Sequence, residues 1–351
     1  MFDTAAYYMV LLMAAIPALT DRNKRPSLGW VAYGFVLLLF IGLRYEVGAD
    51  WEGYNFIMDS LHGQSFDELL EHGELAYNSI LWSSAQMGLD IYGANLATTG
   101  VFLYGLFRYC KIQPNPWVAL FSALPFLVIV VAMSANRQAA AIGVTLLVLA
   151  LWDNTSAFKK MLLIFIAAAF HVSAMIFGVF VVLNSKLAVW KKVVLSSAFF
   201  WAATMLISGN KITDRYESSY IEGKSENVAS GAMQQILLIA IPAVIFLVMS
   251  ARNRNFRLKV PHWDILFVMS ILSLALIPMS FGYSVAASRI SFYMFPVSIA
   301  VLAALPEVLV AKNAAKLLVL TYGFLTLGLW LNFANTAYKW LPYNNFLFQI
   351  F

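Results

Sequence analysis

Residues 161–183, with the sequence MLLIFIAAAFHVSAMIFGVFVVL, decide how this chain is threaded. Their length alone fits a single membrane crossing of roughly 20 residues. A single crossing, however, would place Lys186 and the basic group 252–259 on the outer side, whereas loops rich in Lys and Arg belong on the cytoplasmic side. We therefore predict two short, packed helices that turn near Phe170 and His171. Lipid tolerates such a turn only where it is buried in protein or lines a watery cavity.

The rest of the chain has the composition of a polytopic membrane protein. Hydrophobic residues occupy 61% of the 351 positions and charged residues only 12%, whereas a soluble domain has roughly a quarter of its residues charged. We predict an all-α fold in one integral membrane domain, residues 1–351, with about 12 transmembrane helices. The predicted spans are 5–19, 28–43, 90–107, 117–133, 137–152, 160–170, 172–185, 191–207, 232–250, 263–280, 289–310 and 315–333.

The distribution of basic residues predicts the orientation. With both termini outside, most of the 23 Lys and Arg residues become cytoplasmic, as the positive-inside rule requires. They lie at 22–25, 108–111, 159–160, 186–192, 252–259 and 312–316. Because they are scattered over short loops, the net charge of +5 does not indicate a nucleic-acid partner. The lone Cys110 excludes an internal disulfide framework, and the first apolar run is expected to be a retained span.

Two polar segments are predicted on the outer face. The loop 44–89 contains a helix near 73–88 that is too short and too polar for a confident span, so we expect it to lie at the interface or to re-enter the membrane. The loop 208–231 has mixed charge and small residues, which are typical of a mobile segment able to cover an acceptor.

Arginines gather at the predicted outer edge of the membrane. The stretch GLRYEVGADWEGYNF, residues 42–56, contains Arg44, Asp50 and Tyr54, while Arg137 lies in SANRQAAAIG and Arg289 in AASRISFYMF. Ionisable residues at membrane depth usually face a bundle interior or a water-filled cavity. Because the planar guanidinium matches phosphate geometry and stays charged, three arginines at one level predict an anionic ligand, a diphosphate at the lipid boundary.

Each of these residues also has a purely structural interpretation. Arg44 could snorkel from a helix end, Arg137 and Arg289 could each tie helices together by pairing with a carboxylate, and His171 could be a packing residue. Asp50 and Glu52 form a D-x-E pair that could hold a divalent cation. Since no second acidic pair or histidine cluster accompanies that pair, we expect no metal and no cofactor.

Five segments together resemble the EpsG-type branch of the Wzy class of bacterial polysaccharide polymerases. In chain order they are LRYEVGADWEGYNF, HGELAYNSI, NRQAAAIG, FHVSAMI and LPYNNFL. The family's R-x-x-x-G-x-D-x-x-x-Y block, its Asn-Arg-Gln block and its H-x-S step are matched here by Arg44, Gly48, Asp50, Tyr54, Asn136, Arg137, Gln138, His171 and Ser173. Two positions depart from the family pattern. Trp51 stands where the family commonly has Tyr, and residues Glu74 to Tyr77 lack the Pro-Gly character that often follows the acidic residue. These departures leave the type of substrate undefined.

The resemblance implies a glycosyltransferase with the multi-span C-type (GT-C-like) architecture in the bacterial inner membrane. Its active site would face the periplasm and transfer a growing glycan from undecaprenyl diphosphate to another lipid-linked repeat unit. Besides these lipid-linked glycans and membrane lipid, the implied partners are a flippase and a chain-length-regulating copolymerase. The product could be O antigen, capsule or exopolysaccharide.

That reaction needs a cationic clamp for the leaving diphosphate and a base for the acceptor hydroxyl. We expect Arg137 and Arg289 to hold the diphosphate and Arg44 to order the acidic loop. The candidate catalytic bases are Asp50, Glu74 and His171. We rank Asp50 above His171, because a carboxylate near Arg44 stays ionised and because His171 could instead donate to a phosphate or sugar oxygen. The candidate residues for binding diphosphate or sugar are Arg44, Tyr54, Tyr77, Asn136, Arg137, Gln138, Arg289 and Tyr293.

Three other functions are compatible with parts of the pattern. An O-antigen-ligase-like transferase would use the same donor and differ only in its acceptor. A transporter or flippase for an anionic lipid would also collect arginines, but near the membrane midplane and often with internal repeat symmetry. A structural membrane subunit would need no site at all.

Overall fold

The computed structural model describes residues 4–20, 28–61, 74–208 and 226–349. These residues are overwhelmingly helical and contain no β-strand, although Arg44 and Asn345 form one isolated antiparallel bridge. The predicted all-α fold is confirmed. Of the predicted loop 208–231, residues 209–225 lie outside the described residues, and the remainder belongs to neighbouring helices.

The described residues of the first half of the chain form a series of helices. They are α1 (Ala5–Leu19), α2 (Leu28–Gly42), α3 (Trp51–Leu61), α5 (Leu75–Gln86), α6 (Asp90–Lys111), α7 (Pro116–Ala123), the π-helical η2 (Leu124–Ala132), α8 (Asn136–Ala150), the 3-10 turn η3 (Trp152–Asn154) and α9 (Ala157–Phe170).

The second half continues in the same way. It contains η4 (Val172–Met175), α10 (Ile176–Leu183), α11 (Val189–Ser208), α13 (Glu226–Arg252), α14 (Arg254–Lys259), α15 (Trp263–Ser280), α16 (Ser284–Ser291), η5 (Phe292–Met294), α17 (Phe295–Val308), α18 (Lys312–Phe333), η6 (Ala337–Trp340) and η7 (Phe346–Phe348).

The helices have the apolar character of a membrane protein. Four described helical stretches are long and apolar enough to cross a bilayer, namely Gly231–Arg252, Trp263–Ser280, Ala286–Val308 and Lys312–Phe333. Five shorter apolar helices accompany them, and large apolar side chains such as Ile16, Val194 and Leu325 are exposed on peripheral helices. The chain is therefore a helical membrane protein, whereas the number of crossings stays a prediction.

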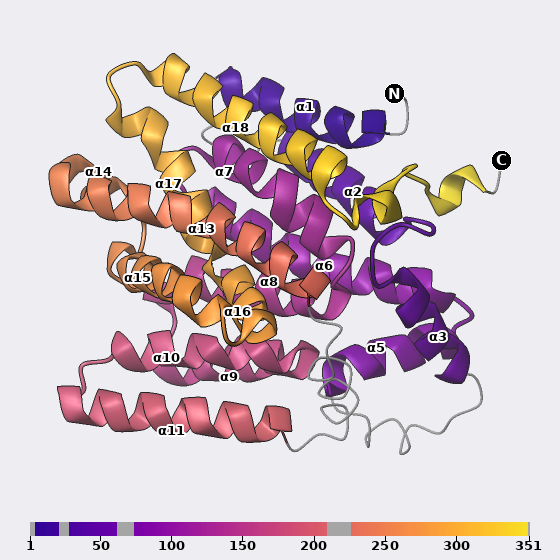
Figure 1. Ribbon diagram of the computed structural model, residues 1–351, viewed down its shortest axis with the longest axis horizontal. Helices are drawn as coiled ribbons and strands as arrows, with labels where there is room; N and C mark the ends of the chain where they lie inside the picture. The colour runs from indigo at the N-terminus through magenta and orange to yellow at the C-terminus, as the bar shows by residue number, and fades with distance from the viewer. Residues whose placement is uncertain (1–3, 21–27, 62–73, 209–225, 350–351) are drawn as a thin grey trace.

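Residues 161–183 form two helices, as predicted. The helix α9 ends at Phe170 because His171 adopts an extended conformation, with φ −157° and ψ 121°. The short turn η4 then reverses the chain into α10, which lies beside α9 (Figure 1). The alternative of one straight crossing is wrong for this chain. In addition, the predicted polar helix near 73–88 is present as α5.

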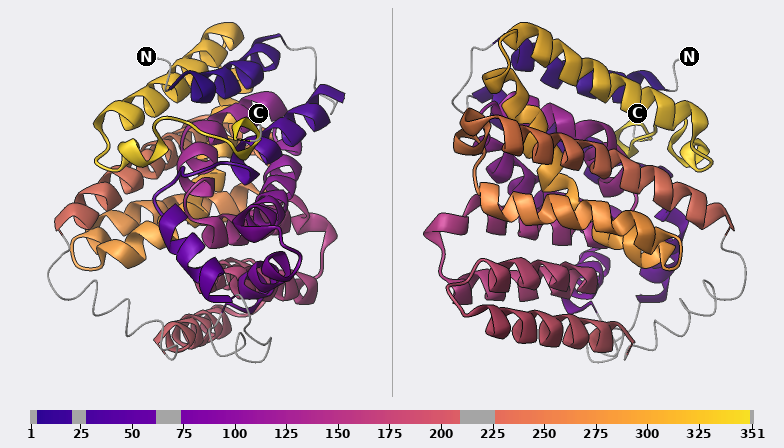
Figure 2. Two further views of the ribbon diagram at one scale, coloured as in Figure 1. Left: turned by 90° about the vertical axis from the view of Figure 1, so that its right-hand side faces the viewer. Right: turned by 60° about the vertical axis from the view of Figure 1, so that its left-hand side comes forward.

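The most buried layer lies between two peripheral groups of helices. In the views of Figures 1 and 2, α1 and α18 lie on one side of the molecule and α9, α10 and α11 on the opposite side. Between them, α7, η2, α8 and α17 are almost completely buried. Helices α6 and α8 approach closely at Gly105, where a Cβ would lie 1.7 Å from the carbonyl oxygen of Gly143. Small residues permit such contacts between membrane helices.

The two ends of the bundle differ in their loops. Helix α14 and the connections α8–α9, α10–α11 and α17–α18 lie at one end, and α3 and α5 lie at the other (Figure 1). The first end therefore collects the basic groups 159–160, 186–192, 252–259 and 312–316. We call it the basic end, and the end with α3 and α5 the acidic-loop end.

The C-terminal segment completes the acidic-loop end by covering the exposed end of α2. The side chains of Asn345, Tyr343 and Arg44 donate hydrogen bonds to the carbonyls of Leu39, Phe40 and Ile41, respectively. These carbonyls lie in the last turn of α2, where helix carbonyls lose their intrahelical partners. The Leu39 carbonyl accepts a second bond, from the N–H of Leu43 at 3.0 Å. The motif LPYNNFL therefore satisfies backbone groups that would be costly to leave unpaired near lipid.

Gly48 allows the same loop to pack against the turn between η2 and α8. Its φ is +109°, and a Cβ there would lie 2.0 Å from the carbonyl oxygen of Met133. Only glycine combines that conformation with so close an approach. The position of the loop 43–50 over the start of α8 therefore depends on this residue.

Candidate functional site

The carboxylate of Glu74 joins two of the predicted site residues. Its Oε2 lies 2.6 Å from the NH1 nitrogen of Arg137, and its Oε1 lies 3.1 Å from Nδ1 of His171. Glu74 precedes α5, Arg137 begins α8, and His171 occupies the turn between α9 and α10. Three segments far apart in the sequence thus meet at one carboxylate, and we call these three residues the Glu74 cluster.

The Glu74 cluster is mostly enclosed. The side chains of Arg137, Glu74 and His171 are 23%, 12% and 11% exposed, so the ion pair is only partly hydrated. Glu74 has a left-handed backbone conformation, with φ 47° and ψ 52°, which is uncommon for a residue with a Cβ. The Nδ1 atom of His171 is itself buried, with Oε1 of Glu74 3.1 Å away.

Two tyrosines flank the guanidinium of Arg137. Its Cζ lies 5.7 Å from the ring centroid of Tyr54 and 5.8 Å from that of Tyr77, within the range of cation–π attraction. The Tyr77 hydroxyl is buried and has no hydrogen-bond partner among the described residues. Because an unpaired buried hydroxyl is costly, this group is a candidate to bond a ligand.

Helix α16 places Arg289 next to the same cluster. The Nε2 of Gln138 donates to the carbonyl of Arg289 at 2.9 Å, and the charge of Arg289 acts on His171. From the other side, Gln235 of α13 donates to the carbonyl of Ser288 at 2.8 Å and accepts from the Ser288 hydroxyl at 2.8 Å. The short α16 is therefore held by one glutamine from α8 and one from α13.

The H-x-S step and Tyr293 form the floor beside His171. The Ser173 hydroxyl lies 3.0 Å from that of Tyr293, which is fully buried. This contact joins η4 to η5, the segment that directly follows α16. Tyr293 therefore packs against the segment that carries His171, and its hydroxyl is paired with that of Ser173.

A comparison with protein families identifies the chain. The model of the EpsG family matches residues 28–345. The chain belongs to the EpsG family. This match spans the candidate site residues and the C-terminal segment that covers α2. None of the curated proteins and none of the solved structures matches the chain.

Family membership defines the general activity. The EpsG-family protein is a polysaccharide polymerase of the glycosyltransferase type. It is also a helical membrane protein, in agreement with its apolar helices. The resemblance drawn from its sequence motifs is thereby confirmed.

Arg44 of the EpsG-family protein has its guanidinium engaged by neighbouring loops. The side chain is 1% exposed, with Nε donating to the carbonyl of Val47 at 3.1 Å and NH2 to Oδ1 of Asn136 at 2.6 Å. Asn136 in turn donates to Asn95 of α6. Arg44 thus joins the loop after α2 to the start of α8, one residue before Arg137. Its predicted role in ordering the acidic loop stays a prediction.

Asp50 lies on the loop before α3, where its charge acts on Arg44 and Tyr54. It is exposed and immediately precedes α3, and the backbone N–H of Tyr54 donates to its carbonyl at 3.0 Å. Glu52 is exposed as well. Among the described residues, no group of three or more His, Cys, Asp or Glu side chains forms a candidate metal site.

The electrostatics of the cluster favour an ionised Glu74 and a neutral His171. Burial raises the pKa of Glu74, but contact with His171 and the charge of Arg137 outweigh burial and hold that pKa below its usual range. Burial lowers the pKa of His171, and although Glu74 opposes this, the charges of Arg289 and Arg137 add to it. A neutral imidazole can accept a proton near neutral pH.

The structure adds residues that the sequence motifs did not single out. Asn95 and Gln235 are buried polar residues on apolar helices, where each polar side chain needs a partner. Their helical positions were visible in the sequence as polar residues within apolar runs. Their partners were not visible, because the contacts join residues 41 and 53 positions apart.

Proposed function

We propose that this EpsG-family protein polymerises undecaprenyl-diphosphate-linked repeat units at the periplasmic face of the inner membrane. The observation that carries the proposal is the enclosed Glu74 cluster with Arg289 beside it. The cluster lies at the end of the bundle opposite the basic end, which the positive-inside rule assigns to the cytoplasm. We extend the proposal to the predicted threading, about 12 crossings with both termini outside, and to a GT-C-like architecture.

In the proposed reaction, a sugar hydroxyl of the acceptor attacks the anomeric carbon of the donor. The bond between that carbon and the phosphate oxygen breaks, and undecaprenyl diphosphate leaves with the bonding electrons. Arg137 and Arg289 stabilise the negative charge that develops on the leaving group. In this step Arg137 exchanges the Glu74 carboxylate for the diphosphate, because a guanidinium binds both oxyanions through paired N–H donors.

We propose that His171 accepts the proton of the acceptor hydroxyl and that Glu74 assists it. With Nδ1 turned toward Glu74 Oε1, the imidazole presents Nε2 to the acceptor hydroxyl and takes its proton during attack. Glu74 then stabilises the imidazolium, as carboxylates do in other base–orienter pairs. The sequence ranked Asp50 above His171, but we assign proton transfer to His171 and Glu74, because Asp50 is exposed on the loop before α3 whereas the cluster is mostly enclosed.

The remaining candidates receive supporting roles. Tyr54 and Tyr77 hold the guanidinium of Arg137, and the Tyr77 hydroxyl bonds a phosphate or sugar oxygen. Asn136, Gln138 and Arg44 position the start of α8 and α16, while Tyr293 supports His171 through Ser173. We propose no metal and no cofactor for this chemistry, since the two arginines supply the positive charge. A flippase and a chain-length-regulating copolymerase are proposed as pathway partners.

Reconstitution with a single purified lipid-linked repeat unit tests the proposal. A polymerase yields a ladder of products, a ligase yields none without a separate acceptor, and a flippase moves the substrate without extending it. Arg137→Ala and Arg289→Ala should each slow ladder formation by about a hundred- to a thousandfold, because each removes a donor at the developing charge. Near-normal rates for both variants at matched protein levels would exclude the arginine clamp.

A further inference from the structure

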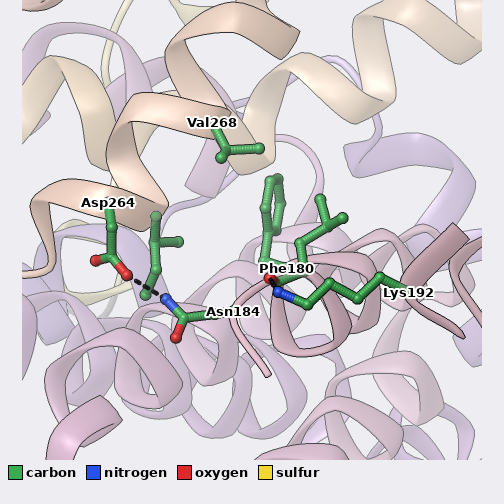
Figure 3. A pocket seen from close by; sticks show the side chains of 7 residues that line it. Phe180, Asn184, Lys192, Asp264 and Val268 are labelled. Atoms are coloured by element: carbon green, nitrogen blue, oxygen red, sulfur yellow. Dashed lines mark hydrogen bonds between the residues drawn. The ribbon is translucent and has the colours of Figure 1, made fainter. Parts of the chain in front are cut away.

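A pocket of about 290 Å³ opens at the basic end of the bundle, away from the Glu74 cluster (Figure 3). It is lined by the end of α10, the start of α11 and the start of α15. Helix α15 rises about 27 Å over its length, and α16 with Arg289 follows its far end. The rim residue Asp264 and Arg289 therefore lie toward opposite ends of α15, although Phe180 on the pocket floor is linked to Tyr293 through Phe177.

The pocket has an apolar floor and a charged rim. Phe180 and Ile265, which are 2% and 3% exposed, form the floor together with Val268. Asp264, Asn184 and Lys192 form the rim, with Asp264 and Lys192 on opposite sides in Figure 3. A site that offers hydrocarbon, a cation and an anion at once is suited to an amphiphile with both charges in its headgroup.

Both rim charges are fixed to the C-terminal end of α10. Lys192 donates from Nζ to the carbonyl of Leu183 at 2.7 Å, and Asn184, which follows α10, donates to Oδ2 of Asp264. Both groups keep further hydrogen-bonding capacity, because the Lys192 ammonium has three donors and the Asp264 carboxylate has two acceptor oxygens. The separation between the positive and the negative group is thus set by the protein before any ligand binds.

The neighbourhood of the pocket has the character of a membrane interface. At the start of α11, Val189, Trp190 and Val193 are exposed, and the ammonium of Lys191 lies 5.4 Å from a Trp190 ring centroid. Exposed tryptophan beside lysine is typical of the headgroup level of a bilayer. Headgroups of the leaflet at the basic end therefore lie at the height of the rim.

We propose that this pocket binds one phospholipid with a primary-ammonium headgroup. The phosphate would bond Lys192, the ammonium would bond Asp264, and the start of an acyl chain would cover Phe180, Ile265 and Val268. A purely anionic headgroup would leave Asp264 facing a like charge, which is unfavourable. A quaternary ammonium would satisfy the charge of Asp264 but donate no hydrogen bond to it.

Native mass spectrometry of the detergent-purified protein tests this site without any assay of polymerisation. The protein is mixed with phospholipids that share their acyl chains and carry ethanolamine, choline or glycerol headgroups. We expect about tenfold stronger retention of the ethanolamine lipid than of the other two. Equal retention of the three, or preference for the glycerol lipid, would overturn the proposal on the unaltered protein alone.

Single substitutions test whether the lipid binds in this pocket. Lys192→Met and Asp264→Asn should each reduce retention of the ethanolamine lipid by about five- to tenfold, the effect of losing one charge-assisted hydrogen bond. The matched control is Lys191→Met, because Lys191 neighbours Lys192 on α11 but lies over Trp190 and outside the pocket lining. An equal loss in the control, or retained binding in both pocket variants, would show that the lipid binds elsewhere.

Discussion

Glu74 connects the two chemical tasks of the proposed reaction through its two carboxylate oxygens. One oxygen contacts Arg137 of the diphosphate clamp and the other contacts the proposed base His171. When Arg137 turns to a diphosphate, Glu74 loses one cationic partner and His171 becomes its main partner. Substrate binding would then raise the basicity of His171 at the moment when a base is needed.

Glu74→Gln is expected to move the acidic limb of the activity profile to lower pH. His171 accepts a proton only while neutral, so activity falls as the pH drops through its pKa, which burial holds below the usual value. Since the Glu74 carboxylate raises that pKa, its replacement by a neutral amide lowers it further. Values of kcat/KM measured between about pH 4 and pH 8 would show the shift, with an overall loss of about ten- to a hundredfold.

Glu52→Gln is the control for this variant because Glu52 is exposed on α3, outside the cluster. Its profile should match that of the unaltered protein. An acidic limb that stays in place or moves to higher pH in Glu74→Gln would contradict the role assigned to His171.

The sequence predicted the residues of the cluster better than their partnerships. Arg137 was named as a site candidate because ionisable residues at membrane depth are costly without a function or a partner. Glu74 and His171 were named because their motifs resemble those of the family. The hydrogen-bond partners of Arg44 could not be predicted in this way. Its carbonyl partners Ile41 and Val47 are backbone atoms of a tight turn, and no pattern of residue types reveals the direction of a side chain.

At the scale of elements, α16 is the segment on which the second clamp arginine depends. It has eight residues and begins without a side-chain cap, so its own hydrogen bonds stabilise it little. Its position is set by Gln138 and Gln235, which bond its carbonyls from two neighbouring helices. Gln235 also donates to the hydroxyl of Ser291 at 2.5 Å.

Gln235→Leu should therefore raise the KM for the lipid-linked donor and slow polymerisation by about tenfold. The substitution removes the acceptor of the Ser288 hydroxyl, at a cost of about 1 to 3 kcal/mol, and frees α16 to shift Arg289. The Ser291 hydroxyl keeps its bond to the Ser288 carbonyl. The matched control is Gln234→Leu, whose glutamine is the preceding residue and is exposed. Steady-state kinetics with varied donor would separate the two, and equal effects would argue against a positioning role.

Hydropathy located the helices well because each predicted span is a long apolar run, and every one of them contains helical residues. It did not predict the π-helical stretch η2, which follows directly from α7. A wider helical turn leaves the residue composition unchanged and depends on how α7 and α8 pack. The break at His171 was predicted only because charge placement, and not hydropathy, required it.

At the scale of the molecule, the separation of a basic end from an acidic-loop end supports the predicted orientation. Single cysteines would test it after Cys110→Ser removes the buried native thiol. In intact cells, Glu46→Cys should react with a membrane-impermeant thiol reagent, whereas Lys186→Cys should react only after permeabilisation. Both positions are exposed, so both should react in detergent. Labelling of the two from the same side would contradict the proposed threading.

The contact between the loop after α2 and residues 343–346 could not be predicted from the sequence. The motif LPYNNFL was visible as a family feature, but its partners lie about three hundred positions earlier. Periodicity reports local structure, and such long-range pairing leaves no periodic trace. The role of this motif as a cover for the end of α2 is therefore known only from the structure.

This pairing also has a consequence for biosynthesis. The N–H of Phe346 donates to the carbonyl of Leu43 at 2.7 Å, and the N–H of Gly48 donates to the carbonyl of Lys339 at 2.8 Å. Because about three hundred residues separate the two partners, a ribosome must make all the intervening helices before these backbone bonds can form. The loop after α2 therefore reaches its final position late in folding, after the helices between the partners have been made.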